Sequence, residues 1–146
     1  MAGPDDPFDL QRYVDAQDER GTYDQALAEL WSGRKRSHWM WFVLPQLAGL
    51  GRSSTAQHFG ITGAEEARAY LAHPVLGPRL RECAQALADR SGTDPVDVLG
   101  PVDALKLRSS MTLFAHVAPD EPVFREVLEH YYDGADDPAT LSLLEL

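Results

Sequence analysis

Apolar residues recur at three- and four-residue spacing along most of the chain, and glycine or proline interrupts the pattern at short intervals. Tyr23, Ala26 and Leu30 illustrate the spacing, and Gly33 follows where the C-terminus of such a helix would fall. No two apolar stretches alternate in a way that would let them pair as strands. We therefore expect an all-α protein, a compact orthogonal bundle of about six to eight helices, several of them short.

The same spacing predicts where the helices lie. The expected ranges are 8–17, 23–31, 38–44, 62–71, 74 to about 91, 102–117 and 122–132, with short turns of helix at 55–59, 94–99 and 137–144. The stretch 38–44 is short enough to be a strand, but helix is favoured because no second strand-like run exists to pair with it. Thr62 and Glu65 match a capping box. With no linker and no repeat, residues 1–146 are expected to form one domain.

The distribution of charge limits the classes of partner. The net charge is −10, which disfavours general binding to nucleic acid or to an anionic membrane surface. Residues 1–30 and 118–146 together hold 16 acidic and 3 basic side chains, whereas residues 31–117 hold 7 acidic and 10 basic. The ends therefore carry −13 and the middle +3, so a locally positive site is expected inside an acidic protein.

Other features set the compartment and exclude some chemistry. The longest apolar run, residues 39–44, is far shorter than the roughly 20 residues that cross a bilayer, and the first residues do not resemble a secretion signal. We expect a cytoplasmic protein. The single cysteine, Cys83, falls on a helical apolar stripe with Leu80 and Leu87, which indicates a buried residue. The five histidines show no paired zinc spacing, so no metal and no cofactor are expected.

Residues 33–42 combine three fixed cations, a histidine and two tryptophans in the sequence GRKRSHWMWF. In one interpretation the cations offset the dipole at the end of a helix and pair with the acidic termini, while the tryptophans fill the core. In the other, Arg34 and Lys35 hold a phosphate or carboxylate and Trp39 or Trp41 stacks on a planar ring. The sequence leaves both interpretations open.

Two further polar segments fit the second interpretation. The loop 49–54 contains Gly51 and an arginine and could face an anion, although it lacks the lysine of a phosphate-binding loop. Lys106, Ser109 and Thr112 interrupt an apolar helical stretch, where they either face solvent or gather at a pocket. Near the C-terminus, the sequence Asp-Pro-Ala-Thr is typical of a helix start and would fix the direction of the Asp137 carboxylate.

Several sequence blocks resemble a bacterial family known as domain of unknown function eighteen-ten. The matching blocks are residues 6–10, 33–46, 49–51, 66–71, 76–80, 105–114 and 137–141. The resemblance implies an all-helical fold and no established activity. The calpastatin label sometimes given to the family has no weight here, because such an inhibitor is a flexible repeat polypeptide and this composition is globular.

Two functional hypotheses follow from these residues. The first is a pocket for a phosphorylated, ring-containing small molecule of the nucleotide or ADP-ribose type, extended by analogy with other small helical families to hydrolysis of an N-glycosidic bond. Its expected catalytic residues are Asp137 and His38. Its expected ligand-binding residues are Arg34, Lys35, Trp39, Trp41, Gln46, Gly51, Lys106, Ser109 and Thr112. The alternative is a non-catalytic protein-interaction or regulatory domain that uses its acidic termini against a basic partner.

Overall fold

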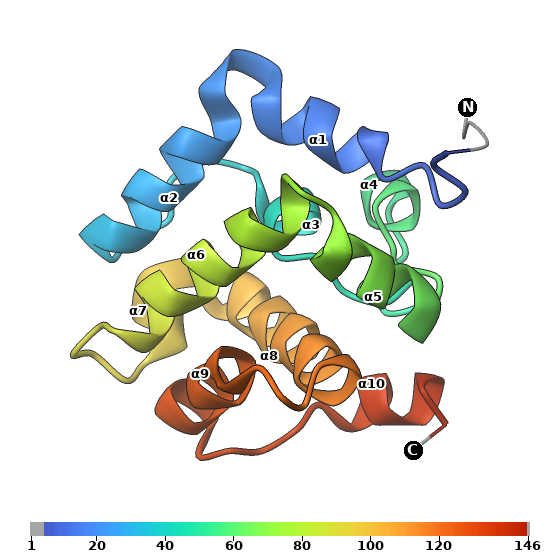
Figure 1. The fold of residues 1–146 in the computed structure, drawn as a ribbon. Helices are drawn as coiled ribbons and strands as arrows, with labels where there is room; N and C mark the ends of the chain where they lie inside the picture. Colours follow the sequence, from blue (N-terminus) through green and yellow to red (C-terminus); the bar gives the residue numbers. More distant parts are fainter. Residues whose placement is uncertain (1–4, 146) are drawn as a thin grey trace.

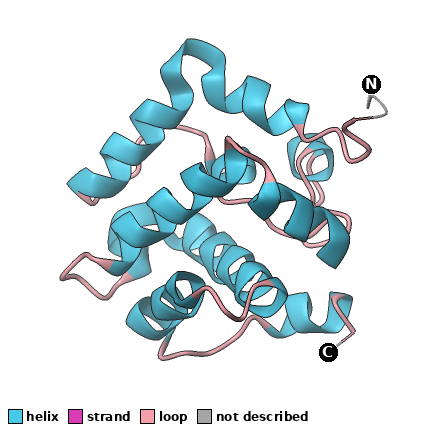
Figure 2. Cartoon of the chain, viewed as in Figure 1, coloured by secondary structure: helices cyan, strands magenta, loops and turns pink. Residues whose placement is uncertain are grey.

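The computed structural model describes residues 5–145 and is built from helices joined by short loops (Figures 1 and 2). The elements are α1 (Gln11–Asp18), the 3₁₀ turn η1 (Glu19–Gly21), α2 (Thr22–Ser32), α3 (Met40–Val43), α4 (Ser54–His58), α5 (Ala64–Ala72), α6 (Leu76–Ala88), α7 (Pro95–Leu99), α8 (Pro101–Val117), α9 (Pro122–Tyr132) and α10 (Pro138–Leu143). This part of the chain contains no strand, and the predicted all-α fold is confirmed. None of its helices combines the length and the apolar character needed to cross a membrane.

The 17-residue helix α8 organises the core. It contacts α5, α7, α9 and α10, and in Figure 1 it extends from α7 at one end toward α10 at the other. Every residue from Ser109 to Ala115 is buried, so several faces of this part of the helix are covered by neighbours. The first two turns are less enclosed, since Val102 and Leu105 are 65% and 67% exposed. This uncovered strip is where the candidate site lies.

Local rules explain most helix starts. The side chains of Ser53, Asp94 and Asp137 accept hydrogen bonds from the first turns of α4, α7 and α10, as N-cap residues do. Proline occupies the first position of α7, α8, α9 and α10, where its missing N–H costs no hydrogen bond. The sequence-based helix at 38–44 is present but shorter, spanning Met40–Val43.

The predicted capping box of Thr62 and Glu65 is wrong. Helix α5 begins after Gly63, and Glu65 is exposed. It is Glu66 that accepts hydrogen bonds from the backbone N–H and the hydroxyl of Thr62, at 2.9 and 3.0 Å. Glu66 is buried and also pairs with Arg12 at 2.9 Å, so a tertiary contact with α1 selects it over its neighbour.

A close approach of two loops fixes the segment that follows α3. Leu47 and Ile61 form an isolated parallel bridge, with Ile61 N–H donating to the carbonyl of Gln46 at 3.0 Å. Gly60 permits this approach, because a Cβ there would lie 2.7 Å from the Cα of Ala48. The backbone of Gln46 is therefore held in place while its side chain stays available.

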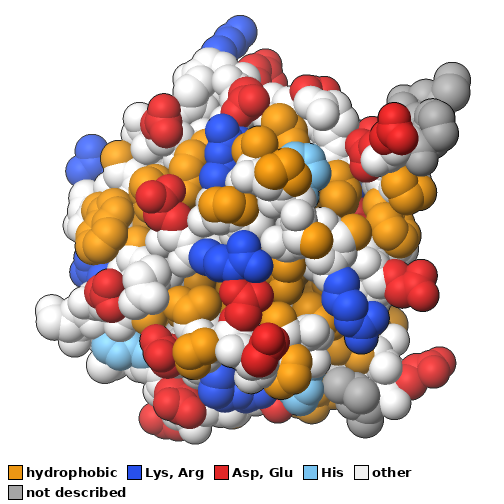
Figure 3. Space-filling model, in the orientation of Figure 1, with side chains coloured by type: hydrophobic (Ala, Val, Ile, Leu, Met, Phe, Trp, Pro, Cys, Tyr) orange, Lys and Arg blue, Asp and Glu red, His pale blue; other side chains and the backbone are white. Residues whose placement is uncertain are grey.

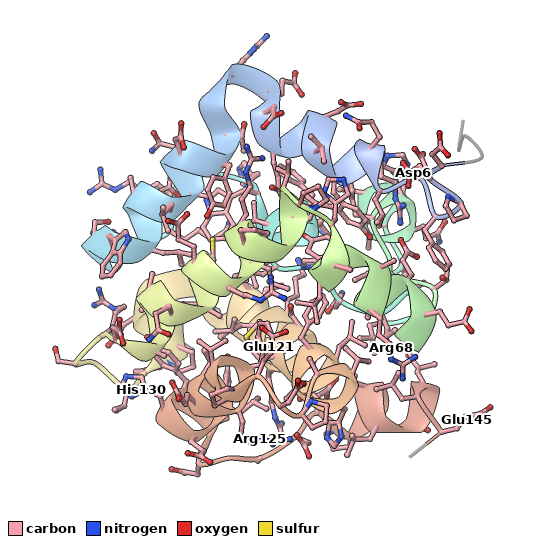
Figure 4. The ribbon with its side chains drawn as sticks, viewed as in Figure 1. Asp6, Arg68, Glu121, Arg125, His130 and Glu145 are labelled. Atoms are coloured by element: carbon pink, nitrogen blue, oxygen red, sulfur yellow. The ribbon has the colours of Figure 1, made fainter. Side chains whose placement is uncertain are left out.

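Charged residues of both signs are interspersed on the face shown in Figure 3. An example is Glu121, labelled in Figure 4 just before α9, whose carboxylate accepts two hydrogen bonds from Arg81 of α6. Cys83 on α6 is fully buried as expected, and burial raises the pKa of its thiol to about 12. A neutral buried thiol behaves as a small apolar core residue.

Helix α6 requires a glycine at its second position. A Cβ on Gly77 would lie 2.1 Å from the carbonyl oxygen of Leu71, which belongs to the backbone of α5 and cannot rotate away. We therefore expect Gly77→Ala to lower the free energy of unfolding by about 1–3 kcal/mol, although alanine favours helix. Urea unfolding followed by circular dichroism measures the difference.

The matched control is Gly92→Ala in the loop after α6, where a Cβ would meet nothing within 4 Å and φ is not in the left-handed region. Its stability should stay within about 0.5 kcal/mol of the unmodified protein. Equal stability of the two variants would contradict the packing of α5 on α6 described above.

Candidate functional site

An open groove of about 420 Å³ lies between α3 with the segment that follows it and the uncovered strip of α8. The first side contributes Trp41, Gln46, Leu50, Gly51, Arg52, Ser53 and Ala56. The α8 side contributes Val102, Leu105, Lys106 and Ser109, and α10 with its cap adds Asp137 and Ala139. Sites for small ligands typically have volumes of roughly 300–1,000 Å³, so this groove is of suitable size.

Several polar groups lining this groove have unused hydrogen-bonding capacity. Within residues 5–145, no hydrogen bond is made by the side-chain amide of Gln46, the indole N–H of Trp41 or the guanidinium of Arg52. Polar groups in a protein interior or cleft are normally satisfied by protein, water or ligand. Arg52 is exposed and Trp41 and Gln46 are partly exposed, so water can satisfy these groups and they stay available to a ligand.

Lys106 provides a cation at the centre of the α8 wall. Its Nζ lies 4.4 Å from the centroid of the Trp41 ring and 3.3 Å from Oδ1 of Asp103. Asp103 is more closely engaged by Lys35, whose Nζ lies 2.9 Å from Oδ2. Two lysines thus share one carboxylate, which leaves a net positive charge next to the groove.

Asp137 is the acidic residue that lines the groove in the described part of the chain. Its Oδ2 accepts hydrogen bonds from the Ser109 hydroxyl at 2.8 Å and from the backbone and hydroxyl of Thr140 at 3.2 and 2.5 Å. Its backbone N–H donates to the buried Thr112 hydroxyl at 2.9 Å. The carboxylate is therefore fixed in direction, while Oδ1 accepts no hydrogen bond from residues 5–145.

The loop that carries Asp137 is clamped from behind. Arg108 donates to the carbonyl oxygens of Ala135 and Asp136 at 3.0 and 2.5 Å. The Asp136 carboxylate pairs with Arg125 of α9, labelled in Figure 4, and with His116, at 2.8 and 3.2 Å. Burial alone would raise the pKa of Asp136, but its hydrogen bonds from Arg125 and His116 outweigh burial and lower it. These contacts hold the loop before α10 in one position, so the Asp137 side of the groove is preorganised.

The structure brings Trp41, Gln46, Gly51, Lys106, Ser109 and Asp137 together from among the expected site residues. Position 51 also requires a glycine for packing, because a Cβ on Gly51 would lie 2.6 Å from the Cβ of Ala56. Thr112 lies behind the groove and acts through Asp137. These six lining residues come from three separate parts of the sequence.

The other expected residues lie elsewhere. Arg34 and His38 are exposed and do not line the groove, and Lys35 is engaged by Asp103. Trp39 is fully buried and donates its indole N–H to Glu29 at 2.9 Å, so it presents no face to a ligand. The core-filling interpretation therefore describes Trp39, while Trp41 fits the ligand interpretation.

Glu29 explains this division of the basic-aromatic segment. The buried carboxylate accepts hydrogen bonds from the backbone N–H of Arg36 and Ser37 at 2.7 and 2.9 Å. The Ser37 hydroxyl, the Trp39 indole and the Gln25 amide complete the set, at 2.6, 2.9 and 2.9 Å. Burial alone would raise the pKa of Glu29, but these hydrogen bonds outweigh it and lower the pKa to about 2. The segment is thus anchored by a charge.

Sequence reasoning missed Glu29 and Asp103. Asp103 precedes Lys106 by three positions, which is a recognisable helical pair, but nothing local predicts that Lys35 reaches the same carboxylate. Glu29 lies on an ordinary amphipathic helix, and its role depends on the loop folding back over it. In the range 5–145, no group of three or more acidic, histidine or cysteine side chains is placed to hold a metal ion.

Comparison with known proteins gives a family and a fold relative. The model of a family described as protein of unknown function (DUF1810) matches residues 7–144. The chain is similar to the crystal structure of the conserved hypothetical protein Rv1873 from Mycobacterium tuberculosis. The two are 49% identical, with a TM-score of 0.93 over 97% of this chain and 99% of that one. No curated protein matches the sequence.

The hydrogen bonds to the Glu29 carboxylate predict that the free energy of unfolding falls at acid pH, a loss called here the acid step. Because the pKa of Glu29 is lowered from 4.5 to about 2, its stabilisation is present above pH 4.5 and is lost as the pH falls toward 2. We expect Glu29→Gln to lower the free energy of unfolding at pH 7 by about 1–3 kcal/mol and to flatten this acid step. Urea unfolding at pH values from 7 to about 2.5 measures both effects.

Glu126→Gln is the control, because Glu126 is an exposed residue of α9 that makes no hydrogen bond or ion pair within the described chain. It should leave stability at pH 7 and the acid step unchanged. If Glu29→Gln loses as much free energy of unfolding at acid pH as the unmodified protein does, the hydrogen bonds to Glu29 are not the cause of that loss.

Proposed function

The chain belongs to the DUF1810 family, and because the family description assigns no activity, we propose from the groove alone that this protein binds a phosphorylated, ring-containing small molecule. The observation that carries the proposal is the set of polar groups in the groove that have no partner within residues 5–145. In this assignment Lys106 and Arg52 hold the anionic group. The Trp41 ring and the apolar side chains of Leu50 and Leu105 contact the planar ring.

The balance of charge in the groove supports an anionic ligand. Lys106 and Arg52 are cations, Asp137 is an anion, and the arginine has no partner in the described chain. The protein as a whole carries −10, so long polyanions are repelled while a small anion can still reach a local positive site. This contrast favours a free small molecule over nucleic acid.

Hydrolysis of an N-glycosidic bond remains a proposal that extends the binding function. Asp137 is placed in the groove and could stabilise the positive charge that develops on a sugar ring during such cleavage. His38, the other expected catalytic residue, is exposed outside the groove and has no role in this version. Release of free base from the bound ligand, measured by chromatography, tests this step separately from binding.

A second candidate function has one observation in its favour. Trp31 on α2 is 56% exposed and is followed by the exposed Arg34 and Arg36. Tryptophan and arginine are the residues most enriched at the energetic centres of protein interfaces. We therefore propose a protein-interaction role at this surface as the second candidate, in place of the expected use of the acidic termini, and it predicts that Trp31→Ala abolishes partner binding without changing the groove.

Thermal denaturation with a ligand panel tests the proposed binding function. The panel contains ADP-ribose, adenosine monophosphate, nicotinamide mononucleotide and inorganic phosphate. A ligand present at about 100 times its dissociation constant stabilises the folded protein by about 2.7 kcal/mol. We expect at least one ring-containing phosphate to raise the melting temperature more than phosphate alone. Arg52→Ala and Lys106→Ala should each weaken binding about tenfold or more.

The control is Arg68→Ala, since Arg68 is an exposed arginine of α5 outside the groove, labelled in Figure 4. It should bind as the unmodified protein does. No shift with any member of the panel, or equal losses in all three variants, would contradict a ligand site in this groove and favour the interaction at α2.

A further inference from the structure

Asp137 places a hydrogen-bond acceptor in a groove whose other charged groups are cations. We propose that the groove selects sugar phosphates with a free hydroxyl, the ribose ring of a ribonucleotide being the fitting class, and that Asp137 Oδ1 accepts that hydroxyl. This inference rests on the proposed binding function and specifies its substrate class. It makes Asp137 a specificity-determining residue.

The first support is the spacing along α8. Lys106 and Ser109 are three residues apart on one face, a rise of about 4.5 Å, and the Ser109 hydroxyl donates to Asp137 at 2.8 Å. The carboxylate, held by Ser109, and Lys106, one turn earlier on α8, therefore line the same groove. A ligand that contacts both must carry an anion at one point and a donor group nearby, as a phosphorylated sugar does.

The second support is the state of the carboxylate. Oδ2 already accepts three hydrogen bonds, whereas Oδ1 accepts none from residues 5–145. An ionised carboxylate only accepts hydrogen bonds and repels a phosphate placed beside it. A ligand group placed next to Oδ1 is therefore favoured if it is a hydrogen-bond donor, and a ligand without a donor there leaves this oxygen without a partner from the ligand.

The third support is the rigidity of the acceptor. Thr112 holds the backbone N–H of Asp137, and Arg108 holds the two preceding carbonyl oxygens. The Asp137 side chain cannot turn away from the groove without breaking the cap of α10. A fixed acceptor discriminates between a hydroxyl and a hydrogen at one position of the ligand more sharply than a mobile one.

Asp137→Asn tests the acceptor without removing the cap, because asparagine is also a strong N-cap residue. The cap hydrogen bonds from Thr140 need an acceptor at the position of Oδ2, so the amide oxygen of the new side chain takes it. The amide NH₂ then occupies the position of Oδ1. The substitution thus exchanges an acceptor for a donor in the groove at nearly constant shape.

The experiment is isothermal titration with adenosine monophosphate and with its 2′-deoxy and 3′-deoxy analogues. We expect the unmodified protein to bind the ribonucleotide about tenfold or more tighter than at least one analogue. Asp137→Asn should reduce this preference to near parity. The matched control is Asp94→Asn, which changes the equivalent Asp-Pro cap of α7 outside the groove and should keep the preference.

The outcomes separate this inference from the proposed function. If adenosine monophosphate binds the unmodified protein but neither analogue is weaker, or if Asp137→Asn keeps the preference, hydroxyl recognition by Asp137 is refuted while ligand binding stands. If none of the three nucleotides binds and the thermal panel also shows no shift, both proposals fail together.

Discussion

The buried carboxylate of Glu29 determines how the most unusual segment of this sequence is used. Five hydrogen bonds converge on it from Gln25 and from residues 36–39, which turns the segment back over α2. Trp39 is drawn into the core by this anchor. Trp41 follows two positions later, at the start of α3, and residues two positions apart on a helix point to nearly opposite sides. One tryptophan therefore packs inside and the other lines the groove.

The groove itself follows from how α8 is covered. Its second half is enclosed by neighbouring helices, while its first two turns leave Val102, Leu105 and Lys106 facing the segment after α3. The close approach of Gly60 to Ala48 fixes that segment on the opposite side. The clamped loop before α10 brings Asp137 to the same place. The three parts of the groove are thus held independently, each by contacts that do not require a ligand.

The fold was predictable because its signals are local. Apolar spacing gave the helices, and Asp94-Pro95 and Asp137-Pro138 marked two helix starts that the structure has. Where a tertiary contact competed with a local rule, the local rule failed: Arg12 selects Glu66, and not Glu65, to bind Thr62. Of the expected site residues, those on α8 and at the α10 cap could be singled out from the sequence because polar groups in apolar helices are conspicuous, and the structure places Lys106, Ser109 and Asp137 at the groove. Arg34, Lys35 and Trp39 were assigned with them because the effect of Glu29 on their segment depends on contacts across the loop.

Titration of the indole N–H resonances by nuclear magnetic resonance tests the central claim most directly, since the three tryptophans report on three environments. Trp41 lines the groove, Trp39 is buried against Glu29, and Trp31 is exposed on α2. On addition of ADP-ribose, the account predicts a saturable shift of the Trp41 indole signal, with those of Trp31 and Trp39 nearly unchanged. An unmoved Trp41 signal, or a shift confined to Trp31, would contradict the assignment of this groove as the ligand site.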